Sequence, residues 1–192
     1  MNEIGSIAWG FAKERFFPKW SVRPSTSFMK YHFNSHSLTG VEIGSQYGYN
    51  AYSLLKQLRN LSLLYLVDPY ASYDEYTESW ATNDGVNVAF EKAKKIVSPY
   101  QLKTRFIRKF SDEAVDDIPN IVDFVYIDGN HDYEFVKQDI DLYYPRVRSG
   151  GVLCGHDFAT HELGVCRAVV EFVNEYDLEL FGEKYDWWVI KP

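Results

Sequence analysis

Cysteine is scarce in this chain, since Cys154 and Cys166 are the only two among its 192 residues. Two thiols in a domain of this size do not form the disulfide framework of small secreted folds, and they fit a reducing cytosol. The segment from Met1 to Lys19 lacks a continuous apolar stretch followed by small residues, which argues against a secretory signal. No apolar run approaches the ~20 residues that a membrane span requires. We therefore expect a cytoplasmic protein with no membrane partner.

Positively charged residues are also few, with 20 Lys and Arg against 27 Asp and Glu and a formal net charge of -7. This balance argues against a general nucleic-acid binder, whose affinity depends on a basic surface. The chain has no internal repeats and no low-complexity segment, and its length suits one domain with a sizeable core. A small molecule is the expected partner, and the oligomeric state is left open, including a homo-oligomer.

The dinucleotide fingerprint G-x-G-x-x-G is missing, and a different glycine turn takes its place. The stretch Val41–Gly48 reads as a short apolar strand that ends near Glu42 and continues into a turn spaced G-x-x-x-G. A helical pattern follows, with one apolar face made of Ala51, Leu54, Leu55 and Leu58. Glycine allows close approach of the backbone to a ligand, and a helix N-terminus favours polar ligand groups. The candidate binding residues of this turn are Glu42, Gly44, Ser45 and Gly48; an ordinary strand–turn–helix junction is the alternative.

A second buried strand, residues 63–67, ends in Asp68 one strand–helix–strand unit later. A carboxylate at this place can hold both hydroxyls of a ribose. Because Pro69 follows it, Asp68 could instead only stabilise a turn. Together with the glycine turn, Asp68 predicts a nucleoside site.

The rest of the chain alternates between apolar strands and helical patterns. Further strands are predicted at residues 104–108, 122–127 and 151–154, with a hairpin of 178–181 and 187–190 around a loop that contains Gly182. Alternating elements imply a parallel sheet with helices on both faces. Residues 1–36 are expected to form an N-terminal extension, whose aromatic residues suggest that it packs on something, and residues 37–192 the domain.

Carboxylates and histidines follow the fourth and fifth strands, as Asp128-Gly-Asn-His131 and His156-Asp157. Ligands of open α/β sheets bind beyond the carboxyl ends of the strands. If the two strands are adjacent, ~4.8 Å apart, Asp128 and Asp157 can converge on one cation such as Mg²⁺, Mn²⁺ or Ca²⁺. His131, with an ordinary pKa of ~6.5, could take a proton near neutrality. The alternatives are a turn role for Asp128, a solvent-facing His131, and a His156 that merely donates to a carbonyl.

These motifs carry a family resemblance. The turn at residues 42–48, joined to Asp68, resembles the nucleoside-binding half of class I S-adenosylmethionine (SAM)-dependent methyltransferases. Residues 127–133, with Asp139, Pro145, Gly150-Gly151 and residues 155–157, look like the family near the macrocin and mycinamicin sugar O-methyltransferases and the cephalosporin-hydroxylase-like proteins. The resemblance covers about residues 40–173. It implies a Rossmann-like three-layer α/β sandwich, with a mostly parallel seven-stranded sheet and a closing antiparallel hairpin.

The same resemblance implies roles for individual residues. SAM would be the cofactor, with Ser111 and Asp112 near the adenine and Asp128 bordering the cofactor as well. A metal would be bound by Asp128, His156 and Asp157, and His131 would be the base. Because His156 stands where the family has an acidic residue, the ion could be Mg²⁺, Mn²⁺, another transition metal or none.

The sequence therefore predicts a SAM-dependent O-methyltransferase that acts on a small hydroxylated acceptor, a sugar or glycoside. One alternative is a SAM-binding module without catalysis, which turnover of SAM would exclude. The other is a nicotinamide-dependent oxidoreductase, which the missing fingerprint disfavours and a cofactor titration would test.

Overall fold

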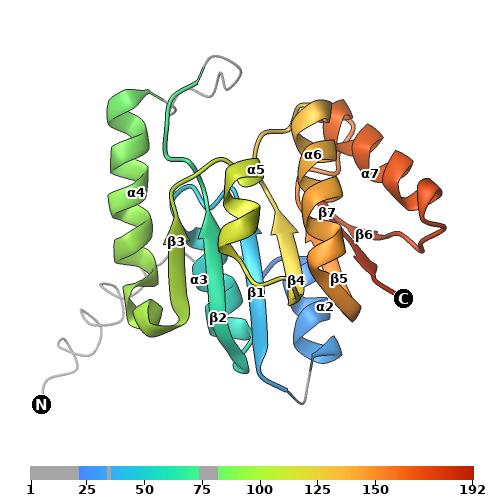
Figure 1. Cartoon of the computed structure of the whole chain (residues 1–192), viewed down its shortest axis with the longest axis horizontal. Helices are drawn as coiled ribbons and strands as arrows, with labels where there is room; N and C mark the ends of the chain where they lie inside the picture. Colours follow the sequence, from blue (N-terminus) through green and yellow to red (C-terminus); the bar gives the residue numbers. More distant parts are fainter. Residues whose placement is uncertain (1–21, 34–35, 74–81) are drawn as a thin grey trace, which may run out of the picture.

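A single seven-stranded sheet, in the order β3-β2-β1-β4-β5-β7-β6, organises the chain (Figure 1). The structure, a computed structural model, describes residues 22–33, 36–73 and 82–192. The strands are β1 Leu38–Ile43, β2 Leu61–Val67, β3 Thr104–Ile107, β4 Val122–Ile127, β5 Val147–Gly155, β6 Phe181–Glu183 and β7 Asp186–Ile190. The described strands β1 to β5 pair in parallel, β7 runs antiparallel to β5, and β6 runs antiparallel to β7. The predicted α/β sandwich and its closing hairpin are confirmed.

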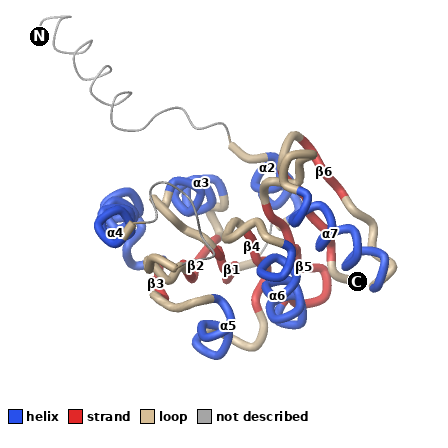
Figure 2. Tube along the Cα trace, turned by 90° about the horizontal axis from the view of Figure 1, so that it is seen from above, coloured by secondary structure: helices blue, strands red, loops and turns tan. Residues whose placement is uncertain are grey.

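Helices cover both faces of the sheet, which gives three layers (Figure 2). One face carries α2 Pro24–His32, α3 Tyr49–Gln57 and α4 Asn83–Val97. The other carries α5 Ser111–Ala114, α6 Tyr133–Tyr143 and α7 Leu163–Glu175. Short 3-10 turns at residues 98–103, 115–117 and 144–146 connect some of these elements. Among the described helices, none has the length and apolar character needed to cross a membrane.

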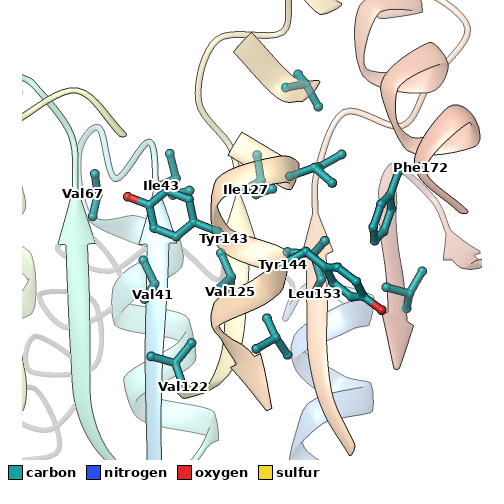
Figure 3. Packing of buried hydrophobic residues seen from close by; sticks show 14 of the residues in the cluster. Val41, Ile43, Val67, Val122, Val125, Ile127, Tyr143, Tyr144, Leu153 and Phe172 are labelled. Carbon is teal, nitrogen blue, oxygen red and sulfur yellow. The ribbon is translucent and has the colours of Figure 1, made fainter. Parts of the chain in front are cut away.

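Alternation along the strands sends neighbouring side chains to opposite core clusters. Val125 and Ile127 of β4 pack with α6 and α7, in a cluster that Figure 3 shows with Tyr143 and Phe172 over the strands. Phe124 and Tyr126 of the same strand belong to the cluster under α2 and α3. The phenol of Tyr126, a polar group on an apolar face, therefore points toward the segment around α2.

The chain crosses the sheet at β1, which pairs with β2 on one side and β4 on the other. Ligand sites of open α/β sheets lie beyond the carboxyl ends of the strands at such a switch point. Ile43 of β1 pairs with Ile127 of β4, and Ile127 pairs with Gly155 of β5. The residues that follow these three strand ends are therefore brought to one edge.

The structure differs from the sequence prediction in some element boundaries. The fifth strand begins at Val147 rather than at Gly151, and the expected turn at Ser149-Gly150 is an irregularity inside it, with Gly150 at φ +69°. In the hairpin, Glu183 pairs directly with Asp186. The turn is therefore Lys184-Tyr185, and Gly182 lies in a strand. Pairing with a neighbouring strand determines both boundaries, and this pairing cannot be recognised from the composition of the segment alone.

The N-terminal boundary stays a prediction. Helix α2, which lies before residue 37, contacts α3, β5, β6 and β7, so part of the predicted extension contributes to the core. The aromatic residues expected to pack nearby, Trp9, Phe11, Phe16, Phe17 and Trp20, lie outside the described residues.

Candidate active site

The glycine turn after β1 adopts a backbone that requires glycine. Gly44 has φ +82° and Gly48 has φ +76°, in the left-handed region that side chains disfavour. A Cβ on Gly44 would lie 2.0 Å from the carbonyl oxygen of Asp128. The close approach that we expected toward a ligand is therefore also an approach to the end of β4. Gly48 itself caps the start of α3.

Asp68 is buried at the end of β2 and fixes the same turn from the other side. Its Oδ2 accepts from the amide of Gln46 and its Oδ1 from the amide of Tyr70, both at 2.8 Å. Burial raises the pKa of Asp68 above its usual value, although these two bonds oppose the shift. A carboxylate has about four acceptor sites, so two remain for ligand hydroxyls. Both interpretations of Asp68, turn support and ribose binding, are compatible with this geometry.

Two adjoining hollows lie beyond the strand ends. The first, a cavity of about 390 Å³, is lined by Asp68, Tyr70, Ser111, His131, His156 and Asp157 among others. The second, of about 320 Å³, is lined by Glu42, Ser45, Asn50 and Lys92 among others. Arg23, Gly44, Gln46 and Asp128 line both and form the wall between them. Most of the predicted site residues are thus gathered around one connected region.

Glu42 is fully buried beside the second hollow. Its Oε1 accepts from the side-chain amide of Asn50 at 2.9 Å. Within the described part of the chain, Glu42 Oε2 and Asn50 Oδ1 are buried without a hydrogen-bond partner. Burial raises the pKa of Glu42 to about 8. Unsatisfied buried polar atoms need partners, so this hollow suits a polar ligand group.

Asp157 joins the two histidines at the far end of the first cavity. Its Oδ2 lies 3.0 Å from Nε2 of His131, and its Oδ1 lies 3.0 Å from Nδ1 of His156. Burial acts to raise the pKa of Asp157, but the bonds from both histidines hold it well below its usual value. Asp157 also has φ +58°, which is uncommon outside glycine, so the tight turn after β5 presents its carboxylate to both rings.

His131 is more basic than its residue type alone suggests. The bond to Asp157 raises the pKa of His131 to about 9, and Glu162, with Oε2 3.5 Å from Nδ1, adds to the shift. The ring is therefore protonated at neutral pH, whereas we expected an ordinary value. Because Asp157 holds Nε2 at 3.0 Å and Glu162 lies farther away from Nδ1, at 3.5 Å, Nδ1 is the nitrogen better placed to release and take a proton.

Arg23 completes the site from a segment that sequence reasoning left unassigned. Its Nη1 donates to Oδ2 of Asp128 at 2.9 Å and also to the hydroxyl of Tyr126. Burial raises the pKa of Asp128 to about 6, and Arg23 opposes that shift. The tyrosine hydroxyl in turn donates to Asp186 Oδ1 at 3.1 Å. Tyr126 and Asp186, polar residues in apolar strands, were the available sequence signal; Arg23 had none.

The positions of the donor atoms suit a divalent ion, but the carboxylates already have positively charged partners. Within the described residues, Asp128, His131 and Asp157 each offer a ligand atom, and these atoms lie within 4.8 Å of one another. Oxygen ligands favour Mg²⁺ or Mn²⁺. However, Arg23 already holds Asp128, and the histidines already hold both oxygens of Asp157. An ion would have to displace these partners and the proton on His131.

The remaining predicted residues are placed less centrally. Ser111 borders the first cavity at the start of α5 and bonds to Asp139, whose burial raises its pKa to about 7. Asp112 is exposed and lines neither hollow. Roles for Ser111 and Asp112 toward adenine stay predictions. Of the aromatic residues that follow Asp68 in the sequence, Tyr70 and Tyr73 line the first cavity, whereas Tyr76 and Trp80 lie outside the described residues.

Comparisons with known proteins agree with this architecture. A family model described as a methyltransferase domain matches residues 41–158. An uncharacterized protein of Acanthamoeba polyphaga mimivirus is 28% identical over 161 residues, which cover 80% of this chain and 65% of that protein. The chain thus spans about two thirds of the length of this relative.

Solved structures share the fold at low identity. A Staphylococcus aureus protein assigned as a caffeoyl-CoA O-methyltransferase has a TM-score of 0.63 and 14% identity, covering 100% of this chain and 93% of that one. A Streptococcus mutans protein assigned as a methyltransferase, crystallised with S-adenosylhomocysteine (SAH), has a TM-score of 0.65 and 13% identity, covering 88% and 98%. At such identities, the likeness concerns the fold alone.

Proposed function

Because the chain belongs to the methyltransferase-domain family, we propose that it is a SAM-dependent O-methyltransferase of a small hydroxylated acceptor, a sugar or glycoside. One observation carries the proposal. Two buried carboxylates, Glu42 near the end of β1 and Asp68 directly after β2, border two hollows that share the wall formed by Gly44 and Asp128. A ligand with one polar end in each hollow matches this arrangement, and SAM is such a ligand.

The cofactor would lie across the shared wall. Asp68 has acceptor sites left for the ribose hydroxyls, and Ser111 borders the same cavity for the adenine. The amino-acid end would enter the second hollow, where Glu42 Oε2 and Asn50 Oδ1 have no hydrogen-bond partner among the described residues. The sulfonium would lie near the shared wall, between the ribose and the amino-acid end of the cofactor.

Methyl transfer to oxygen is an in-line displacement, so the protein must align the two reacting atoms and exclude water. The acceptor would enter the end of the first cavity that His131, Asn130 and Asp157 line. His131, in its neutral form, would take the hydroxyl proton on Nδ1 as the methyl group passes from sulfur to oxygen. Asp157 orients the ring and stabilises the imidazolium that results.

Tyr73, Phe110 and Phe135 also line the first cavity, and the ring of Tyr73 contacts the rings of the other two. Aromatic walls with a few placed polar groups are usual for small-molecule sites. This combination supports a sugar-like acceptor, with its apolar faces against rings and its hydroxyls toward His131. Metal assistance at Asp128, His156 and Asp157 stays a prediction; a bound ion would lower the pKa of the acceptor hydroxyl.

The test has a binding arm and a turnover arm. Calorimetry with SAH should give saturable heat, and methyl-labelled SAM should transfer its label to a glycoside, which mass spectrometry would locate on an oxygen. Folded protein that binds neither SAM nor SAH would overturn the proposal. Binding without transfer to glycosides, catechols or other hydroxylated acceptors would leave a SAM-binding module and contradict the enzyme.

A further inference from the structure

Arg23 occupies the place at Asp128 where a bound cation would be expected. It lies 105 residues before Asp128, yet its Nη1 approaches Oδ2 of that residue to 2.9 Å. The guanidinium also covers the ring of Tyr126, with its central carbon 5.4 Å from the ring centroid. Arg23 lines both hollows, so it lies beside the place where the sulfonium of the proposed cofactor would meet the acceptor.

The support of Arg23 is rigid. Pro24 begins α2, and both the amide and the hydroxyl of Ser25 donate to Oδ2 of Asp186 on β7, the amide at 3.1 Å. Asp186 is 1% exposed and also accepts from Tyr126, which lies on β4. The start of α2 is therefore tied to two strands, and Arg23 is delivered to Asp128 by a buried anchor.

The charge of Arg23 is permanent. Burial acts to lower the pKa of its guanidinium, but Asp128 and its neighbours raise the pKa above its usual value. Asp157, the other carboxylate of the cluster, already has His131 and His156 at 3.0 Å. Two carboxylates this close repel each other. In this chain, the side chains of Arg23, His131 and His156 balance that repulsion, so no divalent ion is needed to do so. An added ion would lie beside a fixed positive charge.

We propose that Arg23 is a built-in cation that replaces a divalent metal at Asp128 and donates a hydrogen bond to the acceptor oxygen during transfer. This inference rests on the proposed function. A guanidinium carries five N–H donors, and both recorded bonds, to Asp128 and Tyr126, start from Nη1. Arg23 releases no proton: the hydroxyl proton goes to His131, and the methyl group leaves sulfur for oxygen. The predicted metal site and this role of Arg23 exclude each other.

Ion binding tests the inference without any turnover. Full-length wild type, Arg23→Gln and Arg59→Gln would each be titrated with Mn²⁺ and followed by electron paramagnetic resonance. Arg59 is an exposed arginine that lines neither hollow and serves as the matched control. We expect Arg23→Gln to bind one Mn²⁺ at least ~10-fold more tightly than the other two proteins. Wild type that binds one Mn²⁺ as tightly as Arg23→Gln would overturn the inference.

Turnover gives the second arm. Wild type should keep its rate in excess chelator, and Arg23→Gln should lose ~10²–10³-fold in kcat, the usual effect of removing one stabilising donor. Arg23→Lys should recover part of that loss because it keeps the charge. Loss of wild-type activity in chelator, or an Arg23→Gln rate within a factor of a few of wild type, would contradict the role.

The two proposals fail in different ways. Absence of SAH binding or of any methyl acceptor would remove the proposed function but would leave the Mn²⁺ titration interpretable. Circular dichroism would establish that each variant is folded. If Arg23→Gln does not fold, wild type alone still decides the inference: loss of its activity in excess chelator would overturn it, and full activity there would support it.

Discussion

His131 shows how much a single neighbour changes the chemistry of a side chain. A histidine usually titrates at ~6.5, which would make it a free base near neutrality. The hydrogen bond that His131 donates to Asp157, aided by the charge of Glu162, raises the pKa of His131 to about 9. At neutral pH most of the protein therefore carries an imidazolium, and only the small neutral fraction can accept a proton from a hydroxyl.

We predict that the kcat of methyl transfer rises with pH and levels off above the His131 pKa of about 9, because His131 must lose its proton before it can act as the base. His131→Ala should lower kcat by ~10²–10⁴-fold, while SAH affinity measured by calorimetry hardly changes. His131→Gln, which cannot titrate, should lose both the rate and this dependence of kcat on pH. Asp157→Asn serves as a second probe, since it removes the main cause of the raised pKa and should shift the rise in kcat to lower pH. An alanine variant within a few-fold of wild type would contradict the base assignment.

Asp68 is the residue on which cofactor binding should depend. Asp68→Ala would leave ribose hydroxyls unpaired, so we expect SAH binding to weaken by ~1–3 kcal/mol. The exposed Asp84, in the first turn of α4, offers Asp84→Ala as the matched control. Since Asp68 also accepts from two backbone amides, circular dichroism must accompany the calorimetry. Equal affinity in the two variants would show that Asp68 only supports the turn.

Residues that act within one strand–turn–helix unit could be predicted from sequence, whereas residues that act across the fold could not. Glu42 lies near the end of an apolar strand, and Gly44 and Asp68 follow apolar strands, so their position at a sheet edge could be predicted from the pattern. Arg23 lies in no such pattern, and its partner is 105 residues away. The raised pKa of His131 likewise depends on Asp157 of a different strand, a contact that composition cannot report.

At the scale of elements, the turn between β1 and α3 links two strand ends. Gly44 donates its amide to Val67 of β2 at 2.8 Å, and Asp128 of β4 donates its amide to Ile43 of β1, also at 2.8 Å. Together, these two bonds join the ends of β2, β1 and β4 at the edge where the site residues lie. The geometry of the turn depends on the absence of a side chain at Gly44.

We predict that Gly44→Ala is strongly destabilising and abolishes SAH binding. The left-handed backbone at φ +82° costs about 1–2 kcal/mol for a side chain, and the new Cβ would lie 2.0 Å from the backbone of Asp128. We expect a loss of more than ~2 kcal/mol in urea unfolding. Gly182→Ala is the matched control, because its Cβ would be 3.5 Å from Asp186 and should cost less than ~1 kcal/mol. Similar losses in both variants would contradict this account.

Element types were predictable because burial leaves a periodic trace. Residues 122–127, apolar apart from Asp123, are the bounds of β4 in the structure. Residues 147–150 lacked such a trace, since Arg148, Ser149 and Gly150 are polar or small, yet they extend β5 through an irregular pairing. The sheet edge decides such a boundary, and the sequence of the segment alone does not.

At the scale of the whole molecule, the fold concentrates raised pKa values around one sheet edge. Burial raises the pKa of Glu42 to about 8, of Asp139 to about 7 and of Asp128 to about 6. With His131 at about 9, four groups hold protons more tightly in the folded chain than in the unfolded one. Perturbed values gathered in one cleft are typical of functional sites. These titratable groups lie close together because the parallel strands of the three-layer fold end at the same edge of the sheet.

We predict that the chain is more stable at mildly acidic than at alkaline pH. Between the ordinary carboxyl pKa of ~4 and the raised pKa of His131, the folded state binds more protons than the unfolded state, so the free energy of unfolding falls as pH rises. For His131, the stabilisation is complete below ~6.5 and is lost through pH 9. Asp157 and Asp123, whose pKa values are lowered, act in the opposite sense only at more acidic pH.

Thermal melting at constant ionic strength measures this slope. Since ~1 kcal/mol shifts Tm by ~2–4 °C in a domain of this size, we expect Tm at pH 5.5 to exceed Tm at pH 8.5 by at least that much. Glu42→Gln removes one of the titrating groups without removing its polar contact to Asn50, so the variant should show a shallower dependence on pH. A Tm that is constant or that rises over this range would mean that the buried carboxyls are compensated in solution.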